Sequence, residues 1–168
     1  MNNETLRNIA LFVGLVLVQI VIFNNINFLG YINPYVYVLF VIIYPFNSNQ
    51  TLFLFLSFLL GLTIDMFTDA GGINAIACLC IAYVRPLVLR FSFGISYEYH
   101  AIRLIQTSVT ERFTYVSIMV VIHHLILFLL ESFNVSLILS TLMKTLFSSI
   151  FTIILSLSFI VLFSRKRA

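Results

Sequence analysis

The chain alternates between long runs of apolar residues and short polar breaks. Six such runs take up most of its 168 residues, over 8–23, 35–46, 51–67, 73–91, 113–130 and 135–163. A helix needs about 20 predominantly apolar residues to cross the hydrocarbon core of a bilayer. Five of the runs satisfy this requirement. The pattern therefore predicts an all-helical integral membrane protein, folded as a single domain with six transmembrane helices.

The run over 35–46 is the weakest of the six. It holds only twelve residues, and it is flanked by Pro34 and closed by Pro45. It is either a short helix or a span that is entered from Phe28 and kinked at Pro34. A proline kink is tolerated in a membrane when neighbouring helices or waters satisfy the freed carbonyl group. We therefore count this run as a span.

The composition supports membrane insertion and leaves no room for a water-soluble domain. Hydrophobic residues make up 61% of the chain and charged residues 9%, whereas a soluble domain is about half apolar and about a quarter charged. The longest polar stretch is 92–112. Apolar residues recur in it at helical spacing, which predicts an interfacial helix. It is either a connector in the headgroup layer, which we favour, or a docking surface for a cytoplasmic partner.

The distribution of Lys and Arg predicts the orientation, because these residues stay on the cytoplasmic side of the spans. With six spans and the N-terminus inside, the cytoplasmic segments hold Arg7, Arg90, Arg103, Arg112, Arg165, Lys166 and Arg167. The external loops, 24–33, 68–72 and 131–134, hold no cation. The first run has no small-residue cleavage site after it, so it is retained as a helix. Both termini are therefore expected in the cytoplasm of a multi-pass inner-membrane protein.

Ionisable residues inside spans are the first place to look for function, since each costs roughly 2.5 to 3.5 kcal/mol at the bilayer centre. Asp65, Arg85, His123, His124 and Lys144 are in this position. If the last span starts at residue 135, Lys144 lies some 13 Å inward, at about 1.5 Å per residue. Its ammonium group then either snorkels back to the headgroups or pairs with Glu131 or Asp65.

The two adjacent histidines point about 100° apart on a helix, so they should not both enter one cavity. We expect one of His123 and His124 to bond across helices and the other to line a polar groove. Cys78 and Cys80 lie two residues apart and face different directions, which disfavours a disulfide or a metal pair. The chain has no nucleophile elbow, zinc-protease motif, phosphate loop or paired acids,. We therefore expect no enzyme activity and no catalytic, cofactor-binding or metal-binding residues.

The stretch 61–75 predicts a tight hairpin between the third and fourth spans. Gly71 and Gly72 permit a turn with positive φ, and Gly61 allows close approach of the two helices. Asn74 can cap the new helix, and Asp65 can accept hydrogen bonds from the start of that helix. We interpret this motif as a structural clasp and not as an ion or proton site. A clasp should tolerate Asp65→Asn, which keeps the size of the side chain and removes its charge.

The hairpin resembles the MreD family of bacterial rod-shape-determining membrane proteins. Gly61, Leu62 and Asp65, followed by the short glycine turn and Gly72-Ile73-Asn74-Ala75, carry the resemblance. The chain length, the six-span layout and the basic C-terminus are also similar to that family. The resemblance implies a non-catalytic scaffold of the cell-elongation machinery that supports rod shape and lateral peptidoglycan synthesis. It would bind MreC and, through it, MreB, RodA and the partner transpeptidase.

The same resemblance implies a fold like the substrate-binding subunit of energy-coupling-factor transporters. A six-helix membrane protein of this size could therefore instead bind a vitamin in a pocket open to the periplasm. Such a subunit would need an ATPase and a coupling subunit as partners. In either case membrane lipid is the surrounding partner, and nucleic acid is not expected.

Overall fold

The computed structural model describes residues 3–26, 33–46, 48–94, 104, 107–132 and 138–165. Within these residues the regular structure is entirely helical. Six α-helices follow one another along the chain: α1 (Asn3–Val21), α2 (Val38–Ile43), α3 (Gln50–Thr68), α4 (Ile73–Phe93), α5 (Val109–Ser132) and α6 (Ile138–Arg165). A short 3-10 turn, η1 (Phe23–Asn25), follows α1.

Four of these helices are long and apolar enough to cross a membrane: Gln50–Thr68, Ile73–Phe93, Val109–Ser132 and Ile138–Leu162. They agree within a few residues with the last four predicted runs. The apolar part of α1, Thr5–Val21, is shorter than the other four. The interfacial helix predicted over 92–112 falls largely outside the described residues, between the end of α4 and the start of α5.

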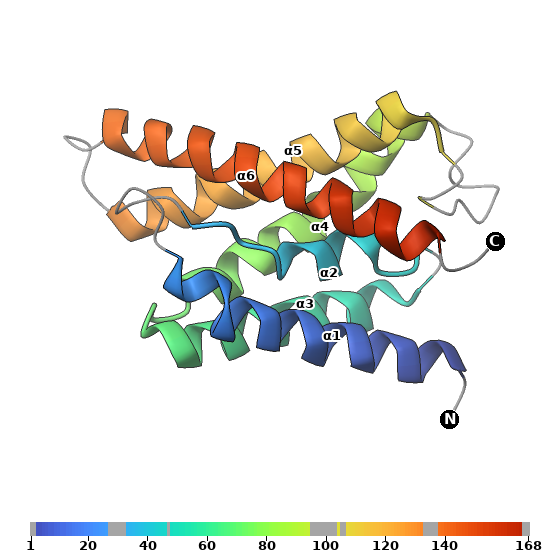
Figure 1. The fold of residues 1–168 in the computed structure, drawn as a ribbon, viewed down its shortest axis with the longest axis horizontal. Coiled ribbons are helices and arrows are strands. Elements are labelled where there is room, and N and C mark those ends of the chain that lie inside the picture. The colour runs from blue at the N-terminus through green and yellow to red at the C-terminus, as the bar shows by residue number, and fades with distance from the viewer. Residues whose placement is uncertain are drawn as a thin grey trace.

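The long helices lie side by side in chain order except for α1 (Figure 1). α3 packs on α4, α4 on α5 and α5 on α6, while α1 packs on α3. α2 lies between them and contacts α1, α4 and α5. The starts of α1, α3 and α5 and the ends of α4 and α6 lie at one end of the bundle (Figure 1). We call this the basic end, for the charges described below.

Residues 33–46 pass through the centre of the bundle, and we call them the buried segment. Only Val38–Ile43 is helical, a length of about 9 Å at 1.5 Å per residue. Tyr44 ends the helix with a ψ of 141°, because the residue before a proline, here Pro45, is driven into extended backbone. Of the two alternatives for the run over 35–46, the structure shows the short helix, and its count as a span stays a prediction. The segment runs from one end of the bundle to the other (Figure 1), mostly as non-helical chain.

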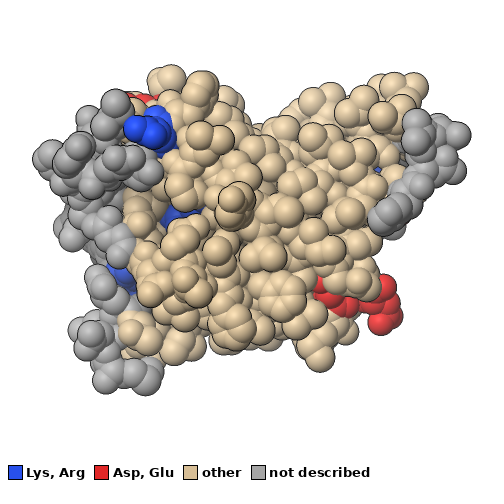
Figure 2. Space-filling view, turned by 180° about the vertical axis from the view of Figure 1, so that it is seen from behind, with Lys and Arg blue, Asp and Glu red and all other residues tan. Residues whose placement is uncertain are grey.

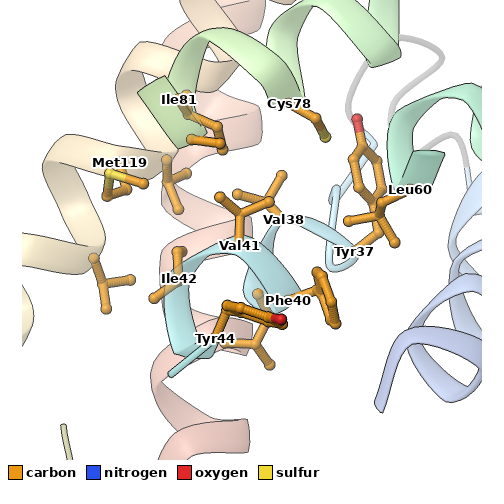
Figure 3. Packing of buried hydrophobic residues seen from close by; sticks show 14 of the residues in the cluster. Tyr37, Val38, Phe40, Val41, Ile42, Tyr44, Leu60, Cys78, Ile81 and Met119 are labelled. Atoms are coloured by element: carbon orange, nitrogen blue, oxygen red, sulfur yellow. The ribbon is translucent and has the colours of Figure 1, made fainter. Parts of the chain in front are cut away.

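The buried segment fills the interior because its residues are apolar on every side. The side chains from Val36 to Ile42 are each at most 2% exposed. Figure 3 shows α2 surrounded by side chains of the neighbouring helices, including Leu60 of α3, Cys78 and Ile81 of α4, and Met119 of α5. Non-helical backbone is stable at this depth only where protein groups satisfy its hydrogen bonds. Those groups define the candidate site.

Charged side chains separate toward the ends of the bundle. In Figure 2 most of the visible Lys and Arg surface lies at one end, the larger acidic patch lies at the other, and a broad uncharged band separates them. Arg7, Arg90 and Arg112 belong to the basic end, where α1 and α5 begin and α4 ends. Asp69 and Glu131 are exposed at the opposite end. This distribution is typical of a protein whose middle faces hydrocarbon.

Candidate functional site

The hairpin between α3 and α4 is a close helix contact. Gly71 and Gly72 have φ angles of 63° and 95°, and Asp69 also has a positive φ, of 51°. A side chain at Gly61 would meet the backbone of the facing helix, its Cβ lying 2.5 Å from Cα of Ala75. The absence of a side chain at Gly61 therefore sets the distance between the two helices.

Asp65 holds the start of α4. One carboxylate oxygen accepts from the amide of Asn74 (3.1 Å) and from its side-chain Nδ2 (2.9 Å), and the other accepts from the amide of Ala75 (2.8 Å). Asp65 is only 6% exposed. A negative charge at this point also interacts favourably with the positive end of the helix dipole. Asp65 thus caps α4 from the neighbouring helix.

This arrangement corrects two expectations about the clasp. Asn74 does not cap α4, because its side chain bridges Asp65 and the buried segment, and the capping residue Gly72 has no side chain. Asp65→Asn should not be neutral, because all three partners of the carboxylate are hydrogen-bond donors. An asparagine would turn an amide NH₂ group toward at least one of them.

A chain of hydrogen bonds links Asp65 to His123. Because Asn74 donates its Nδ2 to Asp65, its Oδ1 faces the hydroxyl of Tyr37, which donates to it at 2.6 Å. The Tyr37 oxygen lies 3.1 Å from Nε2 of His123 and is left to accept from it. Nδ1 of the neutral imidazole then carries no hydrogen, and it has no partner among the described residues. The chain joins α3, α4, α5 and the buried segment.

His124 forms a second chain. Its Nδ1 lies 2.8 Å from the carbonyl oxygen of Val120, which can only accept, so Nδ1 carries a hydrogen. In the neutral imidazole Nε2 therefore accepts from Oγ1 of Thr152 on α6, at 3.2 Å. Thr152 in turn accepts from the amide of Tyr35 at 3.1 Å. This chain fastens the non-helical start of the buried segment to α5 and α6.

The prediction that one histidine lines a polar groove is wrong. Both imidazoles are fully buried, and both lie against the ring of Tyr35, with centroid distances of 6.2 Å for His123 and 5.2 Å for His124. The 100° divergence does not separate them, because the buried segment passes across α5 and meets both.

Gln19 is an organising residue that the sequence analysis missed. Its Oε1 accepts from the amides of Val36 (2.7 Å) and Tyr37 (3.4 Å), and its Nε2 donates to the carbonyl of Pro34 (3.1 Å) and to Oδ1 of Asn24 (2.9 Å). Gln19 is fully buried. Gln19 is the one amide side chain in the interior of the apolar run 8–23, and the next run follows a proline; these two features were the available signal.

Arg85 occupies the other end of α2. Its guanidinium donates to the carbonyl oxygens of Tyr44 and of Ile42 (3.4 Å), and Nε donates to the hydroxyl of Tyr115 (3.0 Å), which itself donates to Ile42. The rings of Phe46 and Phe53 lie 4.7 and 4.6 Å from the guanidinium carbon. The cation is 3% exposed, and no described carboxylate pairs with it. Its counter-charge is the negative end of α2.

The structure does not bring Lys144 to a carboxylate. Within the described ranges no ion pair joins it to Glu131 or Asp65, and Asp65 is engaged with α4 instead. Glu131 is exposed near the end of α5, while Lys144 is half-buried six residues into α6. This placement leaves snorkelling toward the near end of the bundle as the route by which the ammonium group reaches polar surroundings.

The described residues offer little for binding a polar ligand. No group of three His, Cys, Asp or Glu side chains among them could hold a metal ion. Cys78 and Cys80 are free thiols. A cavity of about 410 Å³ lies on the outside of α3 and α4, and its lining of Leu54, Leu79, Cys80, Tyr83 and Val84 is apolar. The polar side chains of the candidate site bind the chain itself.

Comparisons with protein-family models, with curated proteins and with solved structures found no match for this chain.

Proposed function

We propose that this chain is a non-catalytic, six-span scaffold of the bacterial inner membrane that serves the cell-elongation machinery as MreD proteins do. In this proposal it binds an MreC-type protein, and through it MreB, RodA and the partner transpeptidase. It would thereby support rod shape and lateral peptidoglycan synthesis. The family link rests on the hairpin motif of residues 61–75, and the physical argument for a scaffold rests on the interior of the bundle.

The observation that carries the scaffold role is that the protein's own chain fills its centre. Transporters built on broken helices bind substrate anions at exposed helix N-termini and cations at unwound carbonyl groups. Here the amides at the start of α2 are taken by Gln19, and the carbonyl groups at its end are taken by Arg85. The alternative function, a vitamin-binding subunit, needs a cavity inside the bundle. Residues 36–42 are buried there and fill that space. The filled centre favours a body that presents surfaces to partners.

The six-span arrangement with both termini in the cytoplasm is part of the same proposal. α1 and the buried segment would supply two crossings in addition to the four long helices, since each runs between the two ends of the bundle (Figure 1). The basic end, with Arg7, Arg90 and Arg112, would then face the cytoplasm. Reporter fusions at Gln50, Ser96 and Ala168 should report a cytoplasmic location and a fusion at Asn27 a periplasmic one. A periplasmic signal at Ala168 would refute this topology.

The functional test is co-purification with candidate partners from the same genome. The tagged chain should retain an MreC-type protein in detergent, and its depletion should round the cells. Riboflavin, thiamine and biotin should leave its unfolding temperature unchanged. Retention of an ATPase and a coupling subunit, together with stabilisation by one of these vitamins, would instead establish the transporter alternative. Genome context is a rapid first indication, since a neighbouring actin homologue favours the scaffold.

A further inference from the structure

The outer face of α3 and α4 carries an apolar groove, and Arg90 lies beyond it toward the basic end of α4. The groove has a volume of about 410 Å³, and no polar surface lines it. Its lining comes from one residue of α3, Leu54, and four of α4. Tyr83 stands at its rim with 74% of its surface exposed. The groove lies near the middle of α4, where Tyr83 is ten residues from either end of the helix.

Arg90 lies on the same face of α4 as the groove. It follows Tyr83 by seven residues and Leu79 by eleven, which are close to two and three whole turns of 3.6 residues. By this spacing it falls on the same side of α4 as both side chains, with Pro86 of the same helix lying between Tyr83 and Arg90. It lies about 9 Å beyond Val84 toward the basic end, at 1.5 Å per residue. Arg90 is exposed, and within the described part of the chain no carboxylate pairs with it.

We propose that this groove and Arg90 together bind one anionic phospholipid of the cytoplasmic leaflet, with an acyl chain in the groove and the phosphate on the guanidinium. The inference rests on the proposed membrane orientation and not on the MreC partnership. A groove without polar surface suits an acyl chain, and a cation on the same helix toward the basic end suits the phosphate to which that chain is joined. The charge at one end of the groove selects an anion, as basic sites beside membrane-spanning helices do on the cytoplasmic side.

The test uses tryptophan fluorescence, because the chain has no tryptophan of its own. Tyr83→Trp places a reporter in the groove, and Phe147→Trp places a control on the outer face of α6. Each variant is reconstituted into bilayers that contain brominated phosphatidylglycerol or brominated phosphatidylcholine, which quench a neighbouring tryptophan. At Tyr83→Trp, phosphatidylglycerol should bind about fivefold more tightly than phosphatidylcholine. This ratio is the effect of roughly one cation near a membrane surface. At Phe147→Trp the two lipids should quench equally.

Arg90→Gln in the Tyr83→Trp background should abolish the preference, and Arg7→Gln, a cation at the same end on α1, should leave it intact. Equal quenching by the two lipids at Tyr83→Trp would overturn the proposal, as would a preference that survives Arg90→Gln. Protection of the Tyr83→Trp reporter from both lipids would show that protein covers the groove, which also refutes lipid binding. Unchanged gel-filtration profiles would show that each variant is folded.

Discussion

The two ends of the buried segment differ in the number of side chains that bind their backbone groups. At its start, contacts come from several elements: Gln19 of α1, Thr152 of α6 and, through Tyr37, the side chains of Asn74 and His123. At its end, the carbonyl groups depend on Arg85 and on Tyr115, which Arg85 also binds. Both arrangements match the dipole of α2, with oxygens at its amino end and a cation at its carboxyl end. The start is therefore expected to tolerate single losses better than the end.

The largest effect is expected at the end of the segment. Arg85→Leu leaves the carbonyl oxygen of Tyr44 without a partner, removes a donor from Ile42 and abolishes the contact with the Phe46 and Phe53 rings. We expect a loss of about 3 to 5 kcal/mol, since hydrogen bonds to charged groups contribute about 1.5 to 3 kcal/mol each. A thiol-reactive dye that reports exposure of buried Cys78 on heating would measure it in detergent. Arg90→Leu, at an exposed cation of the same helix, is the control and should change little.

Gln19→Leu should have the second-largest effect. It leaves the amides of Val36 and Tyr37 and the carbonyl of Pro34 unpaired, at about 1 to 3 kcal/mol for each buried group that finds no other partner. Because Thr152 still holds the neighbouring amide of Tyr35, we expect a total of about 2 to 3 kcal/mol in the same thermal assay. Gln50→Leu, at the exposed start of α3, should be nearly neutral. A greater loss for Gln19→Leu than for Arg85→Leu would reverse the comparison between the two ends.

Asp65→Asn tests whether the Tyr37 chain depends on the carboxylate. The asparagine NH₂ group would face an N–H of Asn74 or Ala75, which should cost about 1 to 3 kcal/mol. Asp69→Asn, in the exposed turn of the same hairpin, is the matched control, and asparagine tolerates the positive φ there. If Asp65→Asn melts at the temperature of the unmodified protein, the carboxylate is not the element that caps α4.

Thr152→Val should give the smallest effect. The substitution keeps the shape of the side chain but removes the hydroxyl between the Tyr35 amide and His124. We expect a loss of about 1 kcal/mol, with the Gln19 contacts still in place. Combining it with Gln19→Leu should cost more than the sum of the two single losses, because the two side chains hold adjacent parts of one segment. Strict additivity in this double-mutant cycle would argue against shared support at the start.

The sequence by itself determined the helices that face the surroundings. Long apolar runs with few charges fix the four helices that could cross a membrane, since length and hydropathy are local properties. The hairpin was also predictable. Gly71 and Gly72 permit the turn, and Asp65 lies near the end of α3, close to the unpaired backbone amides at the start of α4. The contacts of Asp65 with the start of α4 are those expected from this spacing.

Only the tertiary structure decided what lies inside the bundle. A run of twelve mostly apolar residues after one proline and ending around another has the same composition whether it faces lipid or protein, so 35–46 was counted as a span. Its non-helical backbone is stable only because Gln19, Thr152 and Arg85 reach it from α1, α6 and α4. Arg85 is 41 residues from Tyr44 and Thr152 is 117 from Tyr35. Hydrogen bonds over such separations leave no periodic signal in the sequence, because they depend on which helices pack together.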